Sequence, residues 1–386
     1  MAQQKIPAAY MRGGTSKGVF FLEDDLPSDP VLRDRMLLRV IGSPDAYQKQ
    51  IDGMGGATSS TSKVVLVSRS ARADCDVDYF FGAVAIDSPV IDWSGNCGNL
   101  TAAVGPFAIA QGLVAAPGDG IATVRLWQGN IGKRIIASVP MRDGAVLEEG
   151  DFELDGVTFP SAEIALAFLD PGGAGEADGG AMFPTGNVVD RLHVPGAGTY
   201  SATLINAGNP TIFIDAEALG LRGDELQDRV NNDAALLQRC EAIRAHGAVM
   251  MGLARDSEDA TRNRPATPKL AFVSAPRDYV ASNGKAVDAA GIDLGARILS
   301  MGKLHHAMTG TGAIALAVAA VIPGTIVQLA LGGGQRNQIH FGHPSGTLKV
   351  GAEAIERDGQ WIVAKASISR SARRLMEGWV YVPAAL

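Results

Sequence analysis

Residues 96–111 read Asn-Cys-Gly-Asn-Leu-Thr-Ala-Ala-Val-Gly-Pro-Phe-Ala-Ile-Ala-Gln, a small polar turn followed by almost exclusively small or apolar residues. This composition predicts a helix from about Gly98 to Gln111 that is buried on every side. A second segment echoes the first, because Met308-Thr309-Gly310-Thr311 leads into a small-residue helix over about 312–321 that Pro323-Gly324 ends. Duplicated halves that bring two such helix starts face to face would build a site at their interface. Chance likeness of two small-residue helices is the alternative.

The rest of the chain reads mainly as short strands between turns. Strands are expected at 63–67, 77–81, 122–127, 202–206, 211–214, 326–331, 347–350 and 361–366. Further helices are expected at 29–40 and at 224–251, the latter with a break near 231–232. A flexible loop is predicted at 171–180. We place the domain crossing soon after it, which gives domains 1–190 and 191–386, and the last strand can return to the first domain.

Composition and charge exclude several classes of protein. The chain has 386 residues, 46% of them hydrophobic and 19% charged, which is not the balance of a disordered protein. Its formal net charge of −7 argues against a broad nucleic-acid surface, which needs clustered Lys and Arg. No apolar run reaches the roughly 18 residues that a membrane span needs, and the N-terminus lacks the pattern of a signal peptide. We therefore expect a cytoplasmic protein that binds neither nucleic acid nor membrane.

Cys97 is the first candidate for chemistry. The chain has three cysteines without CxxC spacing, so neither a disulfide framework nor a zinc site is predicted. Cys97, however, lies at a helix start, where unpaired N–H groups and partial positive charge favour anions and stabilise a thiolate. The alternative is a buried structural thiol, the commoner fate of a free cysteine. The polar, glycine-containing turn around it favours a functional thiol.

Lys63 is the second candidate. It ends the run Gly-Met-Gly-Gly-Ala-Thr-Ser-Ser-Thr-Ser-Lys at 53–63 and begins an apolar strand. The run is not a P-loop, because no glycine directly precedes the lysine and Val64 follows it. A partly desolvated amine at the head of a strand can carry a proton. A surface lysine that ends a serine-rich turn is the alternative interpretation.

Two further clusters contain groups that recognise anions. Arg12 lies in Met-Arg-Gly-Gly-Thr-Ser-Lys-Gly at 11–18 and could pair with a substrate carboxylate, although a plain turn also fits. His305, His306 and His343 lie near a second glycine-rich region. Adjacent histidines point in different directions and no nearby carboxylate completes a triad, so we predict hydrogen bonds to an acidic ligand and no metal site. No dinucleotide fingerprint is present.

Several of these stretches resemble the PrpF family. The resemblance covers essentially the whole chain and is carried by residues 12–18, 52–63, 93–99, 301–306 and 342–348. It implies an α+β, diaminopimelate epimerase-like fold of two pseudo-symmetric domains, each a strand-rich, barrel-like shell around a central helix. It also implies that Lys63 and Cys97 are catalytic. Thr309 lies near the place where diaminopimelate epimerases have a second cysteine, so Lys63 would supply the missing acid/base group.

The resemblance further implies a cofactor-independent isomerase of unsaturated tricarboxylates. The run at 52–63 is similar to the branch that isomerises 2-methylaconitate in the 2-methylcitrate route of propionate breakdown. Alternatives are a 4-oxalomesaconate tautomerase and a non-catalytic tricarboxylate-binding protein. The sequence is compatible with a homodimer and with functional pairing with an aconitase-type hydratase. The expected substrate-binding residues are Arg12, Gly13, Ser16, Ser59, Ser60, Thr61, Asn96, Gly98, Asn99, Lys303, His305, Thr309, Gly310, Thr311, His343 and Ser345.

Overall fold

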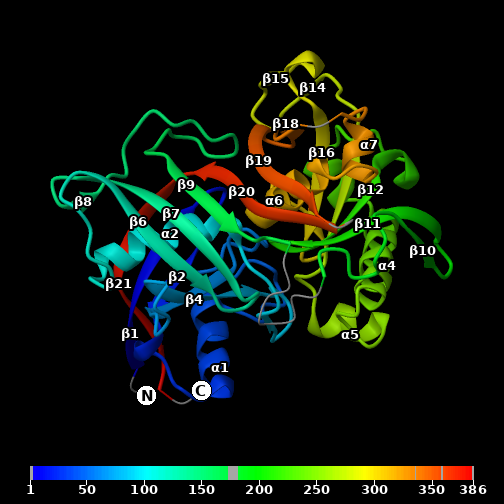
Figure 1. Cartoon of the computed structure of the whole chain (residues 1–386). Helices are drawn as coiled ribbons and strands as arrows, with labels where there is room; N and C mark the ends of the chain where they lie inside the picture. Colours follow the sequence, from blue (N-terminus) through cyan, green and yellow to red (C-terminus); the bar gives the residue numbers. More distant parts are fainter. Residues whose placement is uncertain (1–2, 173–180, 335, 358–359, 385–386) are drawn as a thin grey trace.

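The strands form two curled shells, each around one buried helix (Figure 1). The computed structural model describes residues 3–172, 181–334, 336–357 and 360–384; the loop expected at 171–180 lies outside them except for its first two residues. The first shell contains β1 (Gln3–Gly13), β2 (Ser16–Leu22), α1 (Pro30–Ile41), β3 (Lys63–Arg69), β4 (Val77–Val84), β5 (Ile91–Asp92), α2 (Gly98–Ala110), β6 (Gly120–Gln128), β7 (Lys133–Arg142), β8 (Ala145–Val146) and β9 (Ile164–Leu169).

The second shell begins with β10 (Asp190–Val194), β11 (Gly198–Ala207) and β12 (Asn209–Asp215). It continues with α3 (Gln227–Asn231), α4 (Ala234–Met250), α5 (Ser257–Asn263), β13 (Lys269–Ser274), β14 (Tyr279–Val280), β15 (Ala286–Val287), β16 (Leu294–Ser300), β17 (Lys303–Leu304), α6 (Gly310–Val321), α7 (Ile326–Ala330), β18 (Gln338–His343) and β19 (Gly346–Arg357). The last two strands, β20 (Gln360–Arg370) and β21 (Ala372–Pro383), follow.

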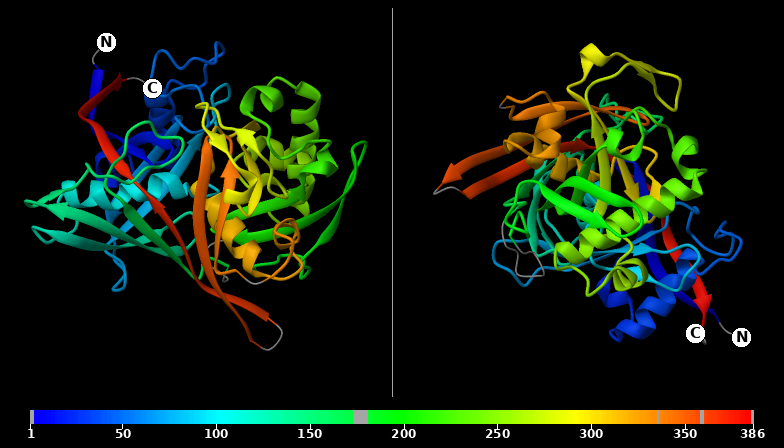
Figure 2. Two further views of the ribbon diagram at one scale, coloured as in Figure 1. Left: turned by 90° about the horizontal axis from the view of Figure 1, so that it is seen from above. Right: turned by 90° about the vertical axis from the view of Figure 1, so that its right-hand side faces the viewer.

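One continuous hydrogen-bonded path joins the two shells. It runs β21–β1–β2–β3–β4–β6–β7–β9–β20–β19–β18–β16–β13–β12–β11–β10. Strand β20 lies between β9 and β19, and β21 returns to pair antiparallel with β1, so the two ends of the chain lie close together (Figure 2). The final strand thus belongs to the first shell. The predicted boundary near residue 190 stays a prediction.

The two halves repeat the same strand order. In the first half, β1 and β2 form a hairpin that pairs Gly13 with Ser16, β3 lies parallel to β2, and β4 lies antiparallel to β3. In the second half, β11 and β12 form a hairpin that pairs Ala207 with Asn209, β13 lies parallel to β12, and β16 lies antiparallel to β13. The duplication suggested by the two helix starts therefore extends to the strands.

Helices α2 and α6 fill the two shells and meet at their first residues. Every residue of α6 is buried, and one hydrophobic cluster contains side chains from both helices. A Cβ placed on Gly98 would lie 2.7 Å from the carbonyl carbon of Gly310, so only glycine permits this approach of the two backbones. The predicted buried helices at 98–111 and 312–321 are confirmed, with α6 beginning two residues earlier than expected.

The strand expected at 326–331 is wrong, because Ile326–Ala330 forms the short helix α7. Thr325 caps this helix, and its Oγ1 accepts a hydrogen bond from the N–H of Gln328 at 3.1 Å. That local bond satisfies a helix-end donor and outweighs the strand preference of the Ile-Val pair. The break expected near 231–232 is confirmed by the separation of α3 from α4. Among the described residues no helix is long and apolar enough to cross a membrane.

Candidate functional site

A small cavity, here called the inner cavity, lies where the first turns of α2 and α6 meet. It is lined by Ser16, Lys63, Phe81, Ala83, Gly95, Asn96, Cys97, Asn99, Asn209, Ala266, Lys269, Ser300, His305, Thr309 and Thr311. Its free volume is about 20 Å³, which is enough for about one water molecule. These walls therefore leave too little free volume for a ligand of several carbon atoms, which needs them to move apart.

Lys63 and Cys97 both face this cavity. Lys63 is the first residue of β3 and is 7% exposed, and its Nζ lies 4.7 Å from the centre of the Phe81 ring. Cys97 is the N-cap of α2 and is 8% exposed, with its Sγ 4.0 Å from Ser16 Oγ. The structure thus brings together the two residues that the sequence analysis expected to be catalytic.

The charge of the inner cavity suits an anion. Two lysines line it, Lys63 and Lys269, and the helices α2 and α6 each direct a positive N-terminal end at it. None of the lining residues is Asp or Glu. The nearby Asp92 accepts hydrogen bonds from the N–H groups of Ser94 at 2.8 Å and Ala266 at 2.7 Å, so its carboxylate holds two loops in place.

Asn96 leaves one hydrogen-bond donor without a partner at this site. Its backbone N–H donates to Asn209 Oδ1 at 2.8 Å, and its carbonyl accepts from Asn209 Nδ2 at 2.8 Å, which ties the two halves together. Its Oδ1 accepts from the hydroxyl of Tyr79 at 3.1 Å. Its Nδ2 is buried and finds no acceptor among the described residues. Buried donors are almost always paired, and Asn96 lines the inner cavity, so this amide is a candidate donor to an acceptor bound there.

Asn99 connects the inner cavity to a buried cation behind it. Its Nδ2 donates to Thr15 Oγ1 at 3.0 Å and to the carbonyl of Met308 at 3.3 Å, while its Oδ1 accepts from Arg370 Nε at 2.9 Å. Burial lowers the pKa of Arg370 to about 9, so the guanidinium keeps its charge at neutral pH. Arg370 therefore adds positive potential near Cys97 without lining the cavity.

His305 contributes a neutral ring to the wall. Burial, with the charges of His306, Lys63 and Lys269, holds the pKa of His305 well below its usual value. Its Nδ1 accepts a hydrogen bond from the N–H of Ala307 at 3.1 Å, and its ring stacks on His306 with centres 4.7 Å apart. At neutral pH this histidine therefore lines the cavity as an uncharged group.

A larger cavity of about 670 Å³, here called the outer cavity, shares Ser16 with the inner one. Arg12, Ser60, Thr61 and His306 line it. Arg12 Nη1 donates to the carbonyls of Gly14 at 3.2 Å and Ser371 at 3.1 Å, and its Nη2 donates to Ser161 Oγ at 3.0 Å. The structure thus places Arg12 away from Lys63, as a tie between chain segments.

Seven of the expected binding residues line neither cavity: Gly13, Ser59, Gly98, Lys303, Gly310, His343 and Ser345. Lys303 is exposed, with its Nζ 3.5 Å from the carbonyl of Asn231. Ser345 donates through its Oγ to the carbonyl of His306 at 2.6 Å, and its N–H donates to His343 Nδ1 at 3.2 Å. Ser345 therefore links His343 to the backbone of His306. Gly98 and Gly310 form the contact between the helix ends.

Sequence reasoning missed Lys269, and a signal for it was present. Residues 63–68 read Lys-Val-Val-Leu-Val-Ser and residues 269–274 read Lys-Leu-Ala-Phe-Val-Ser. Both are a lysine followed by four apolar residues and a serine, which matches the duplication seen in the helix starts. Asn209 and Ser300, also missed, have no comparable signal because they depend on the turn and the strand pairing around them.

The chain is similar throughout its length to known proteins. The family described as "PrpF protein" matches residues 3–383. A 2-methyl-aconitate isomerase of Shewanella oneidensis is 61% identical and one of Cupriavidus necator is 62% identical, each over 99% of this chain and 98% of the relative. A 4-oxalomesaconate tautomerase of Pseudomonas putida is 40% identical over 99% of this chain and 97% of the relative.

Solved structures agree with the described fold. The crystal structure of methylitaconate-delta-isomerase is 39% identical, with a TM-score of 0.75 and coverage of 100% of this chain and 99% of that one. A probable proline racemase, at 13% identity and a TM-score of 0.56 over 98% of this chain and 93% of that one, shows the same fold alone. The expected diaminopimelate epimerase-like architecture is thereby confirmed. By its family match and by relatives above 60% identity over nearly its whole length, the chain belongs to the PrpF family.

Proposed function

We propose that this chain is an isomerase that interconverts the cis and trans forms of 2-methylaconitate. The observation that carries the proposal is the placement of Lys63 and Cys97 on one small cavity that is lined by two lysines and by no carboxylate. A trianionic substrate requires such a site. The two relatives above 60% identity are both named 2-methyl-aconitate isomerase, which supports this substrate over others of the family.

The proposed reaction is a proton transfer. The amine of Lys63 removes a proton from the substrate carbon that lies between the double bond and a carboxylate. The electron pair that remains is delocalised over three carbons as an allylic carbanion, so the former double bond gains single-bond character and can rotate. The proton then returns to carbon from Lys63 or from the thiol of Cys97. Atoms and charges balance without any other reactant.

The same geometry stabilises the intermediate. Developing negative charge spreads onto the carboxylates, where the N–H groups at the first turns of α2 and α6 are already oriented. The unpartnered Nδ2 of Asn96 supplies a further donor. Preorganised donors in a site that excludes water are usually the largest contribution to the rate. Closure of the cavity around the substrate therefore contributes to catalysis as well as to binding.

Substitution of the two proposed proton carriers tests this mechanism. We expect Lys63→Met and Cys97→Ala each to lower kcat for 2-methylaconitate by about 10² to 10⁴-fold, the usual contribution of a general acid or base. Absorbance of the conjugated acid follows turnover, and circular dichroism verifies folding. Lys349→Met, which removes an exposed lysine on β19, is the matched control. Turnover near the wild-type rate in both variants would rule the mechanism out.

A substrate panel in D₂O distinguishes the proposed activity from its alternatives. Proton abstraction predicts deuterium in recovered substrate and product, whereas a tricarboxylate-binding protein without catalysis predicts ligand affinity and no label. We expect turnover of 2-methylaconitate to exceed that of 4-oxalomesaconate; the reverse order would assign the chain to the tautomerase group.

The setting of the reaction is also proposed. Isomerisation of 2-methylaconitate fits the 2-methylcitrate route of propionate breakdown, in the cytoplasm and without a cofactor. An aconitase-type hydratase would act on the same carbon skeleton. Gel filtration with light scattering tests whether the chain is a homodimer, and co-elution tests the hydratase partner.

A further inference from the structure

Lys269 is a second amine in the inner cavity that the proposed mechanism does not use. It is the first residue of β13, is 7% exposed, and lines the cavity together with Lys63 and Cys97. Its Nζ donates to the carbonyl of Ala266 at 3.2 Å and lies 3.5 Å from Ser300 Oγ. An ammonium has three N–H donors, and these two neutral acceptors account for two of them.

The strand register makes Lys269 the counterpart of Lys63. Val64 pairs with Val19 on β2, which sets Lys63 beside Gly18, two residues after the turn residue Ser16. Lys269 pairs with Thr211 on β12, again two residues after the turn residue Asn209.

The antiparallel partners correspond as well. Lys63 pairs with Ala83 on β4, and the pairing of Leu270 with Leu299 sets Lys269 beside Ser300 on β16. Both neighbours line the inner cavity. The wall is therefore built from equivalent positions of the two halves, and each half contributes one lysine.

The two lysines differ in what holds their amines. Among the described groups, the amine of Lys63 is accompanied by an aromatic ring, whereas that of Lys269 has two hydrogen-bond acceptors. Acceptors favour the protonated, donating form of an amine. The counterpart of Cys97 also differs, because Thr309 caps α6 by accepting from the N–H of Gly312 at 3.2 Å. The second half thus holds its amine by hydrogen-bond acceptors, whereas the first half sets its amine against an aromatic ring.

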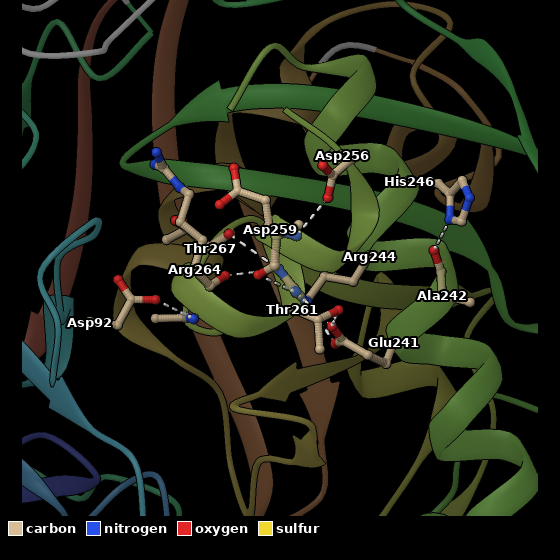
Figure 3. A network of polar contacts seen from close by, with 12 residues as sticks. Asp92, Glu241, Ala242, Arg244, His246, Asp256, Asp259, Thr261, Arg264 and Thr267 are labelled. Atoms are coloured by element: carbon tan, nitrogen blue, oxygen red, sulfur yellow. Dashed lines mark hydrogen bonds and ion pairs between the residues drawn. The ribbon is translucent and has the colours of Figure 1, made fainter. Parts of the chain in front are cut away.

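A buried network holds the segment that positions Lys269 (Figure 3). Arg244, 4% exposed, donates to the carbonyls of Arg264 at 3.0 Å and Thr267 at 3.2 Å, and it pairs with Glu241 at 2.6 Å. From the other side, Asp92 accepts from the N–H of Ala266. The carbonyl that Lys269 contacts is therefore fixed from two directions.

Several groups act on the charge of Lys269. Burial is the largest and, with the charge of Lys63, lowers the pKa of Lys269 to about 8; Cys97 and Asp92 raise it, and Arg244 lowers it. At neutral pH the amine is therefore mostly protonated. Among the groups that line the inner cavity none is a carboxylate, so an incoming carboxylate is the ion that this ammonium lacks.

We propose that Lys269 binds one carboxylate of the substrate through its remaining N–H and thereby makes the site selective for tricarboxylates over dicarboxylates. The inference rests on the proposed function for the identity of the substrate. The first turns of α2 and α6 and the Lys269 ammonium give the cavity three separate places for negative charge, which equals the number of carboxylates on the proposed substrate.

Two saturated ligands that differ by one carboxylate test this role. Propane-1,2,3-tricarboxylate and glutarate have the same chain, and calorimetry measures their affinities without any turnover. We expect wild-type protein to prefer the tricarboxylate. Lys269→Met should weaken tricarboxylate binding by at least about tenfold, the value of a hydrogen bond to a charged group, and change glutarate binding by much less. Lys349→Met is the control for loss of a lysine that does not line the cavity.

Further variants separate selectivity from folding and from proton transfer. Lys269→Gln keeps a donor without the charge and, if Lys269→Met does not fold, reports the same ratio of affinities. Both variants should still exchange deuterium into 2-methylaconitate at a reduced rate, whereas Lys63→Met should not. An unchanged ratio of the two affinities overturns the proposal, as does loss of exchange equal to that of Lys63→Met. Absence of wild-type turnover would instead reject the proposed function and leave the affinity ratio as a separate result.

Discussion

The inner cavity places two amines and one thiol where water is scarce. Burying a charged amine costs free energy, and the protein accepts this cost at Lys269 with only neutral groups as hydrogen-bond partners. Buried polar and charged groups that lack partners are concentrated at functional sites, because the ligand supplies the missing partner. The unpartnered Nδ2 of Asn96 belongs to the same pattern.

Lys269 should make the stability of the free protein depend on pH. Burial lowers its pKa from 10.5 to about 8, so between these values the unfolded chain binds more protons than the folded one, and stability rises with pH. The cost of charging Lys269 is therefore complete below pH 8 and disappears above 10.5. We expect Lys269→Met to remove about 3 kcal/mol of this pH-dependent cost.

Urea unfolding of wild type and Lys269→Met at pH 7.5 and 10 measures the effect. The methionine also alters packing, so the difference in unfolding free energy between the two proteins at one pH is not informative. The informative result is how that difference changes from pH 7.5 to pH 10. A difference that is the same at both pH values would show that the pKa of Lys269 is the same in the folded and in the unfolded chain.

At the scale of elements, the contact between α2 and α6 defines the site. Gly98→Ala would place a Cβ 2.7 Å from the backbone of Gly310, which forces the helix ends apart. We expect a loss of about 1 to 3 kcal/mol of stability, as for overpacking in a core, and at least tenfold in kcat/KM because the N–H groups lose their orientation.

Gly118→Ala is the matched control, since a Cβ there meets nothing within 4 Å. Denaturant unfolding and steady-state kinetics on the two variants make the comparison. Wild-type activity in Gly98→Ala would mean that the separation of the helix ends does not matter to the reaction.

Elements were predictable where local pattern and burial agree. Helices α2 and α6 have no polar face, and a continuous run of small residues can be satisfied only inside a shell, so their sequence predicts their place. The segment Ile326–Ala330 begins with two β-branched residues, which favour a strand, but the cap by Thr325 stabilises a helix. Arg12 illustrates the limit for side chains, because its partners Ser161 and Ser371 are distant in sequence and only the fold brings them near.

At the scale of the whole molecule, the two shells are joined through β20 and share a hydrophobic cluster. Cooperative unfolding follows, since neither half can open without exposing the core of the other. We expect Ile298→Ala, in the second half, to lower stability by about 2 to 5 kcal/mol. The transition should shift equally by far-UV circular dichroism and by tryptophan fluorescence, to which Trp93, Trp127 and Trp379 of the first shell contribute together with Trp361 on β20. Two separate transitions would show that the halves unfold independently.

Lys63 and Cys97 were predictable because each stands in a distinctive local run, and the cavity that unites them could be anticipated from the two helix starts. Lys269 repeats the pattern of a lysine followed by four apolar residues and a serine that begins at Lys63, but the repeat alone does not place it on the cavity. The register that pairs it with Thr211 does. Long-range pairing is the information that a single sequence hides best.

The bare backbones of Gly98 and Gly310 have an evolutionary consequence. With no side chain between them, the two helix ends are in direct backbone contact. A point mutation at either glycine therefore cannot change the distance between the helix ends in small steps. Adaptation of this architecture to other acidic substrates must then change residues that line the inner cavity, such as Ala83 and Ser300, while the distance between the helix ends stays the same.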